Sequence, residues 1–316
     1  MILLSILAFI VIFSSLILIH EAGHFFAAKK SGVKVLEFGL GFGKKIYGKQ
    51  VGETEFTINA IPFGGFVRME GEEEASNDPR SFRNVVLWKQ MIITLAGVFM
   101  NFVFAILLLS ILFSLGTNPI LISKNDYIKA YESGALVLQN KDGSTFASVE
   151  TFPSLDDAVE SAGDADIKMT FVQKIKKPFL KALPFAFTET FRISWAVVEK
   201  VSEIPIEIIE NHKLPDGMAG PLGIAEVTHK VVPLGILALL KLAALLSISL
   251  GVMNLLPIPA LDGGRFFFQI LALLLMPFKI KHSEKLEEWA HVGGYFLLMG
   301  FLLVVTWNDI VRIFFL

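Results

Sequence analysis

The chain of 316 residues contains no cysteine. This absence excludes a thiol nucleophile, a disulfide and a zinc site with cysteine ligands, and it leaves the redox compartment undetermined. Neither sign of charge is in clear excess, because 28 Lys and Arg stand against 30 Asp and Glu, for a net charge of -2. Without a basic field the composition gives no argument for a nucleic-acid partner.

Charge is scarce over long stretches of the chain. No charged side chain precedes Glu21, 53% of the residues are hydrophobic, and the mean hydropathy is +0.62. This composition is too apolar for an ordinary soluble domain and predicts an α-helical integral membrane protein. The first apolar run has no basic segment before it and continues to Lys29, which favours a retained span over a cleaved signal peptide. About four runs have the length of a transmembrane helix: residues 1–28, 90–115, 231–256 and 293–311.

The first of these runs contains an H-E-x-x-H motif, His20-Glu21-Ala22-Gly23-His24. On a helix, His20 and His24 share one face, so both imidazoles can reach one metal ion, while Glu21 could hold a water there and accept its proton. The motif also arises by chance, and a lone buried histidine is more often a hydrogen-bonded core residue. An ionisable cluster inside a membrane span is costly, which favours a metal site. The site would lie roughly 13 Å inside the end marked by Lys29.

A catalytic zinc needs a third protein ligand and an open position. Asp262 is favoured because it follows a helix break at Pro257 and Pro259 and is the only Asp in the apolar region of the third span. It could instead cap a helix that begins near Gly264. The other candidates are histidines outside the spans: His212, His229, His282 and His291.

The segment between the first two spans predicts β structure. Residues 53–61 alternate, residues 62–69 follow with a turn at Gly64-Gly65, and the glycine-rich residues 35–47 are also compatible with a strand. One interpretation is a surface hairpin. The other is a small sheet re-entering the membrane, whose open edge pairs with an extended substrate, so that Gly64 and Gly65 bind it. The sequence alone leaves both open.

The chain divides into four predicted parts. Residues 1–116 and 231–316 form the two halves of a transmembrane core, which encloses the other two parts. Residues 117–177 form a small extracytoplasmic α+β segment, with strand, helix and strand at 145–149, 154–162 and 167–172. Residues 178–230 form an amphipathic, membrane-associated connector. Its amphipathic stretch, residues 178–201, could equally be core packing or a short span, although Glu189 and Arg192 argue against a span. In the second span, Ala96, Gly97 and Asn101 are assigned to helix packing.

These motifs together resemble the site-2 protease family of intramembrane zinc metalloproteases, in its bacterial RseP-like branch. Residues 20–24 look like the zinc motif of that family. Asn-Leu-Leu-Pro-Ile-Pro-Ala-Leu-Asp-Gly-Gly at residues 254–264 is similar to its second motif, so that Asp262 matches the third ligand. Residues 38–43 and 61–66 look like its re-entrant β region.

The resemblance implies Zn2+ as the cofactor, Glu21 as the base, and Asn254 as a residue that helps place the substrate or the oxyanion. It implies single-span membrane proteins as substrates, such as anti-sigma factors or remnant signal peptides. Lysine-rich loops on one side predict a multi-pass protein of the bacterial cytoplasmic membrane with its active site toward the cytoplasm. The chain has Val98 and Arg265 at positions where the family often has Pro and His. Residues 118–170 are too short for a full PDZ domain, so that only a reduced PDZ-like segment is expected within residues 117–177.

Two other classes compete with a protease. A metal transporter would also place His and Asp in its spans, but it has no evident use for Glu21 or for a hairpin beside the site. An inactive, substrate-binding relative would be expected to lose a ligand or the base, yet all four residues are present in this sequence.

Overall fold

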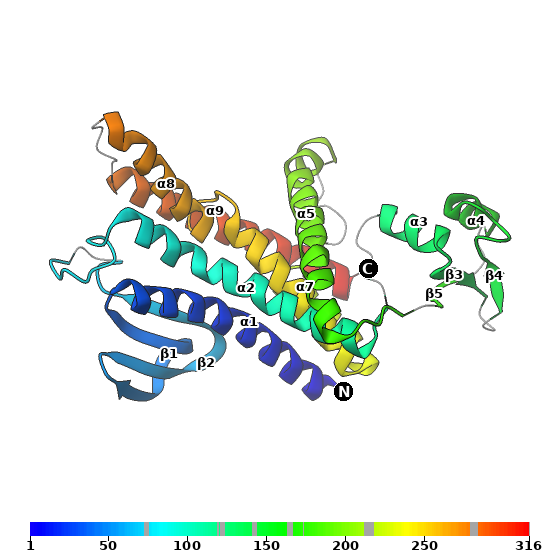
Figure 1. Cartoon of the computed structure of the whole chain (residues 1–316), viewed down its shortest axis with the longest axis horizontal. Helices are drawn as coiled ribbons and strands as arrows, with labels where there is room; N and C mark the ends of the chain where they lie inside the picture. The colour runs from blue at the N-terminus through cyan, green and yellow to red at the C-terminus, as the bar shows by residue number, and fades with distance from the viewer. Residues whose placement is uncertain are drawn as a thin grey trace. The chain divides into compact units, whose positions relative to one another are not determined.

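The computed structural model describes residues 1–72, 76–118, 120, 124–140, 144–162, 167–172, 174–211, 218–278 and 284–315. The chain forms two compact units (Figure 1). One combines Met1–Ala105 with Lys200–Leu316, and the other is Ile106–Glu199. Each unit is described by itself below.

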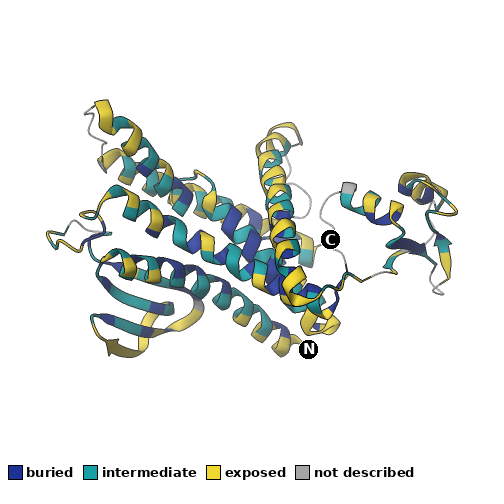
Figure 2. Cartoon of the chain, viewed as in Figure 1, coloured by how far each residue is buried: buried dark blue, intermediate teal, exposed yellow. Residues whose placement is uncertain are grey.

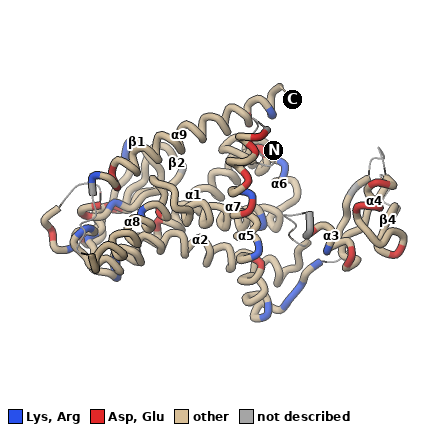
Figure 3. The backbone as a smooth tube through the Cα atoms, turned by 90° about the horizontal axis from the view of Figure 1, so that it is seen from above, with Lys and Arg blue, Asp and Glu red and all other residues tan. Residues whose placement is uncertain are grey.

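Four helices of the described chain are long and apolar enough to cross a membrane. They are α1 (Ile2–Ser31), α2 (Leu87–Leu115), α7 (Ile236–Leu255) and most of α9 (Glu284–Phe314). Few charged residues lie along α1, α2 and α7 (Figure 3). This confirms an integral membrane protein with four spans. The last helix begins before the predicted residue 293, because its charged first turns, which hydropathy alone excludes, are also helical.

The surface of α1 is apolar on every side. Its first residues are largely exposed, including Ile2 at 71% and Leu3 at 80%, whereas its buried residues gather in its second half (Figure 2). An apolar helix whose backbone bonds are all internal is suited to contact with lipid on its open faces. Only the second half of α1 therefore carries the buried polar groups of the site.

The β structure lies beside α1 as two long antiparallel strands, β1 (Val35–Val51) and β2 (Thr54–Met69). Phe38 of β1 aligns with both Phe56 and Val67 of β2, so the first half of β1 lies between the two halves of β2. The segment from Gly65 to Met69 is therefore an edge, and among the described residues no strand pairs with its other side. The predicted strands are confirmed.

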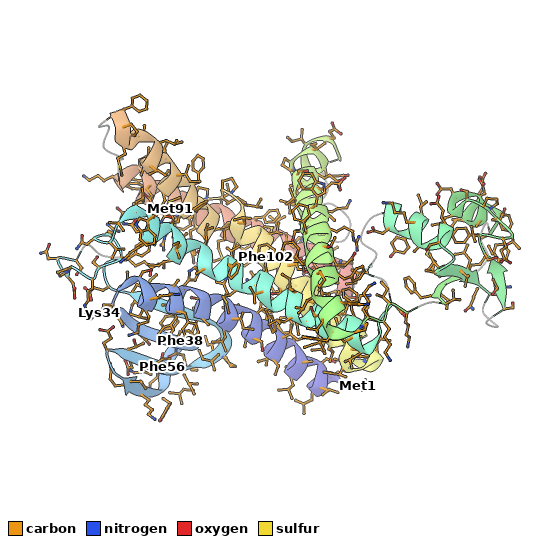
Figure 4. All side chains as sticks on the ribbon, in the orientation of Figure 1. Met1, Lys34, Phe38, Phe56, Met91 and Phe102 are labelled. Atoms are coloured by element: carbon orange, nitrogen blue, oxygen red, sulfur yellow. The ribbon has the colours of Figure 1, made fainter. Side chains whose placement is uncertain are left out.

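Aromatic packing fixes this sheet to α1. The ring of Phe25 lies 5.4 Å from that of Phe38 and 5.8 Å from that of Phe56 between centroids, and the last two side chains are labelled in Figure 4. Each such pair contributes about 0.5–1.5 kcal/mol beyond its area burial. At the turn between β1 and β2, Glu53 accepts hydrogen bonds from Lys29 and Arg80 at 2.8 and 2.7 Å, and these cations lower the pKa of its carboxyl group. Phe25 and Lys29 together hold this end of the sheet against the last turns of α1.

The broken region after α7 continues into α8 (Asp262–Leu275) and a short 3-10 turn, η2 (Met276–Phe278). Before α7, α6 (Pro221–Val231) is followed by η1 (Val232–Leu234). The N–H of Gly223 in α6 donates to Oδ2 of the fully buried Asp309 in α9 at 2.7 Å. This bond ties α6 to the last span.

The second unit contains a small three-stranded sheet with two helices. Tyr131, Leu136 and Leu155 lie in its apolar core. The elements are α3 (Lys124–Glu132), β3 (Leu136–Gln139), β4 (Thr145–Ala147), α4 (Leu155–Ala162) and β5 (Lys168–Phe171), and the strand order is β4-β3-β5. The predicted strand, helix and strand are confirmed here.

A single long helix, α5 (Phe179–Asn211), follows β5 and extends beyond the predicted amphipathic stretch. It presents exposed aromatic side chains at Phe187, Phe191 and Trp195. The boundaries of the four predicted parts remain predictions.

Candidate metal centre

The second half of α1 brings two imidazoles together. His20 and His24 are one turn apart and only 6% and 8% exposed, and their Nε2 atoms lie 3.1 Å from each other. The helix α2 approaches closely because Gly23 has no side chain: a β-carbon there would lie 2.3 Å from the carbonyl oxygen of Ala96. The close contact of these two helices shields the imidazoles from lipid.

The helix break between α7 and α8 delivers the carboxylate. Ala260 has φ of 77°, a left-handed conformation that is uncommon for a residue with a side chain, and its N–H donates to Nδ1 of His291 at 2.8 Å. Asp262 is then the first residue of α8, whose N-cap is Leu261. Its side chain lies beside the two histidines, and the N-cap position is occupied by Leu261 and not by Asp262.

The three donor atoms fit a tetrahedral zinc ion. Oδ2 of Asp262 lies 3.0 Å from Nε2 of His20 and 3.4 Å from Nε2 of His24. Two ligands at ordinary zinc bond lengths and a tetrahedral angle are about 3.3 Å apart. Oδ2 is also buried without a hydrogen-bond partner among the described residues, which is expected of an atom whose partner is a cation.

Neighbouring polar groups hold each imidazole in the tautomer that a metal requires. Nδ1 of His24 donates to the carbonyl oxygen of Ile93 at 2.8 Å, which leaves the Nε2 lone pair free. Nδ1 of His20 lies 3.2 Å from Nδ2 of the fully buried Asn101, and Oδ1 of Asn101 has no partner among the described residues. Amide nitrogen and oxygen are interchangeable by rotation, and the rotated amide accepts the Nδ1 proton of His20.

Two cavities of about 230 Å³ each meet at this cluster and share His20, Glu21 and Asp262. One extends between α1 and α7, where Asn254 lines it, and the other extends toward the edge of β2. A β-carbon on Gly65 would lie 3.7 Å from Cγ of Glu21, so the sheet edge passes next to this carboxylate.

The structure thus brings together the predicted ligands and places Glu21 and Asn254 along the same cavities. Gly64, which also has a positive φ of 81°, forms the turn next to this edge. A set of three donors with open space and a carboxylate beside it can activate water for hydrolysis.

The competing histidines are engaged elsewhere or not described. His291 bonds to the backbone of Ala260, and His229 bonds to Oγ of Ser5 at 2.9 Å. His212 and His282 lie outside the described residues.

Sequence reasoning missed Asn101, which it assigned to helix packing. The available signal was a strongly polar amide in an otherwise apolar span.

Residues 8–301 match peptidase family M50. The regulator of sigma-W protease RasP of Bacillus subtilis is 28% identical over an alignment that covers 98% of this chain and 99% of that protein. The zinc metalloprotease RasP of Bacillus licheniformis is 28% identical with the same coverage. A Clostridium acetobutylicum protein named as a zinc metalloprotease is 33% identical, with 96% of each chain covered.

The chain therefore belongs to peptidase family M50, the site-2 protease family, and is a membrane-embedded metalloprotease. The alignment with the Bacillus subtilis relative is 429 positions long, whereas this chain has 316 residues, so the relative carries a long stretch that this chain lacks.

Proposed function

We propose that the protein hydrolyses peptide bonds within the transmembrane segments of single-span membrane proteins. The observation that carries this proposal is the convergence of His20, His24 and Asp262 beside Glu21, in helices long and apolar enough to cross a membrane. Because both histidines lie within the apolar helix α1, the reacting bond would be below the membrane surface.

His20, His24 and Asp262 would hold zinc through two Nε2 atoms and one carboxylate oxygen. When bound, zinc supplies Lewis-acid polarisation of the scissile carbonyl and lowers the pKa of water. Glu21 accepts a proton from the attacking water, and the remaining hydroxide of that water adds to the carbonyl carbon. Glu21 then returns the proton to the nitrogen as the carbon–nitrogen bond breaks, which yields one carboxyl end and one amine end.

The substrate must be extended to be cut, because the amides of a helix are internally bonded. The open edge from Gly65 to Met69 can pair with one stretch of extended substrate backbone beside Glu21. Asn254 lines the cavity between α1 and α7, and its amide would donate to the carbonyl oxygen of the substrate.

The expected location is the bacterial cytoplasmic membrane with the site toward the cytoplasm. The loop between α1 and α2 is rich in lysine, and the segment after Asp262 adds further cations, which supports a cytoplasmic position for both. The name of the Bacillus subtilis relative, a protease that regulates a sigma factor, supports substrates of the anti-sigma class.

A metal transporter is the rival function, and Glu21 separates the two. We would co-express the chain with a tagged single-span substrate in a host without its own relative, and compare it with Glu21→Gln. We expect cleavage by the parent, no cleavage by the variant, and equal zinc content in both. Bound zinc without cleavage of several substrates would favour a transport or binding role instead.

A further inference from the structure

An ion pair joins the loop after β2 to the start of α8, close to the metal centre. Nη1 of Arg265 donates to Oε1 of Glu72 at 2.5 Å, and these residues lie 193 positions apart in the sequence. The side chain of Glu72 is only 15% exposed. Because removing charges from water costs several kcal/mol per ion, a pair of this kind is weak support for stability and its position in the fold needs another explanation.

The Glu72–Arg265 pair lines two neighbouring cavities. The inner cavity of about 230 Å³ contains the histidines and Asp262, and the outer cavity of about 610 Å³ is lined by charged side chains that include Arg83, Lys285 and Glu288. Four residues line both cavities: Glu72, Phe82, Arg265 and His291. These four residues lie where the two cavities adjoin and are called the wall below.

The pair is packed into this wall. The guanidinium of Arg265 lies 5.8 Å from the ring centroid of Phe82, which adds a cation–π contact to the ion pair. Arg265 is three residues after Asp262 in the same helix, so the wall is built on the element that carries a candidate metal ligand. Glu72, in contrast, lies at a bend three residues after the end of β2.

We propose that the Glu72–Arg265 pair is the closure of a polar passage between the catalytic cavity and the outer cavity. This inference rests on the proposed hydrolysis, which consumes water and leaves charged carboxylate and amine ends. Neither water nor such ends partition favourably into lipid, so both need a polar path. When the pair separates, the passage admits water and releases the polar end of a product. The guanidinium of Arg265 matches the new carboxylate in charge and in hydrogen-bond geometry.

The cysteine-free chain allows a direct test by thiol labelling of the full-length protein in lipid nanodiscs. Val67→Cys would place a thiol in the inner cavity, and Ala272→Cys would place one in the outer cavity only. The probe is a charged, membrane-impermeant methanethiosulfonate. We expect slow labelling at position 67 and an increase of about tenfold after Glu72→Gln. The rate at position 272 should stay unchanged.

Two further variants make the test specific to this pair. The charge swap Glu72→Arg with Arg265→Glu restores the ion pair and should restore slow labelling at position 67. Glu53→Gln breaks the half-buried ion pairs at the turn between β1 and β2 and should leave the labelling rates unchanged. The proposal would be overturned if position 67 still labels slowly in Glu72→Gln. It would also be overturned if position 67 labels fast in the charge swap while position 272 labels at its normal rate.

The labelling rates require no cleavage of any substrate. A protein that labels as expected but cuts nothing would contradict the proposed function and leave the closure in place. A protein that cuts its substrate but whose inner cavity labels at the same rate in every variant would contradict only the closure.

Discussion

Gly97 of α2 lies directly against His24 of α1: a β-carbon on Gly97 would be 2.3 Å from Nε2 of His24 and 2.8 Å from Nε2 of His20. These are the two atoms that would hold the metal. The absence of a side chain at Gly97 therefore leaves space for the metal centre as well as for the contact between the helices.

Gly97→Ala is accordingly expected to remove most of the bound zinc. Even one methyl group would displace both imidazoles, since the backbone of α2 cannot move away without losing its contact with α1. The zinc-to-protein ratio of the purified variant is the measurement. Gly300→Ala is the control, because a β-carbon there meets no atom within 4 Å. Full zinc content in Gly97→Ala would show that the two imidazoles do not form the site.

Asn101 is expected to orient His20 through its Nδ1 proton. Loss of a partner of this type lowers metal affinity by about 10–100-fold. Asn101→Ala should show this loss in a competition assay with a chromophoric chelator. Gln269→Leu, which removes another buried amide and its 3.0 Å bond to Thr94, should leave the affinity unchanged. Equal effects of the two substitutions would assign Asn101 to packing alone.

Asp309 and Asp262 should separate stability from metal binding. Asp309→Ala leaves the N–H of Gly223 without its acceptor and removes one of the two carboxylates that the guanidinium of Arg312 contacts. The substitution should cost about 1–3 kcal/mol of stability while zinc is retained. Asp262→Ala should instead abolish zinc binding. Thermal unfolding and metal analysis of both variants check these outcomes, and zinc retained at full occupancy in Asp262→Ala would remove that residue from the ligand set.

Gly64 shapes the turn before the open sheet edge. Its φ of 81° disfavours a side chain by about 1–2 kcal/mol, and a β-carbon would also meet the ring of Phe42 at 2.6 Å. Gly64→Ala should therefore raise KM for a membrane substrate while zinc content stays normal. Gly52→Ala is the matched control, because Gly52 also has a positive φ but a β-carbon there meets no atom within 4 Å. Equal KM values in the two variants would exclude the edge from substrate binding.

The sequence predicts the parts of this protein that follow from local patterns. Apolar runs locate the spans, the four-residue spacing of His20 and His24 places both on one helical face, and the proline break before Asp262 marks a departure from regular structure. These features are readable because each depends on residues close together in the chain. The meeting of Asp262 with the histidines is a long-range contact, and it could be predicted only because both elements carry unusual polar residues in apolar surroundings.

The sequence could not predict contacts made by the backbone or by loops. The carbonyl oxygen of Ile93 holds His24, but any residue at that position offers the same carbonyl. Glu72 lies in an acidic stretch that is typical of a solvated loop, and its partner Arg265 comes 193 positions later. The double pairing of β1 also has no local signal, because it depends on how β2 folds back along both sides of it.

The most direct test of intramembrane proteolysis is the mass of the products. We would reconstitute the purified, zinc-loaded protein in liposomes with a single-span test substrate of known sequence and measure both fragments by mass spectrometry. The account predicts new termini inside the apolar segment of the substrate, and no such fragments with Glu21→Gln. Termini found only in the soluble flanks, or the same fragments produced by Glu21→Gln, would contradict it.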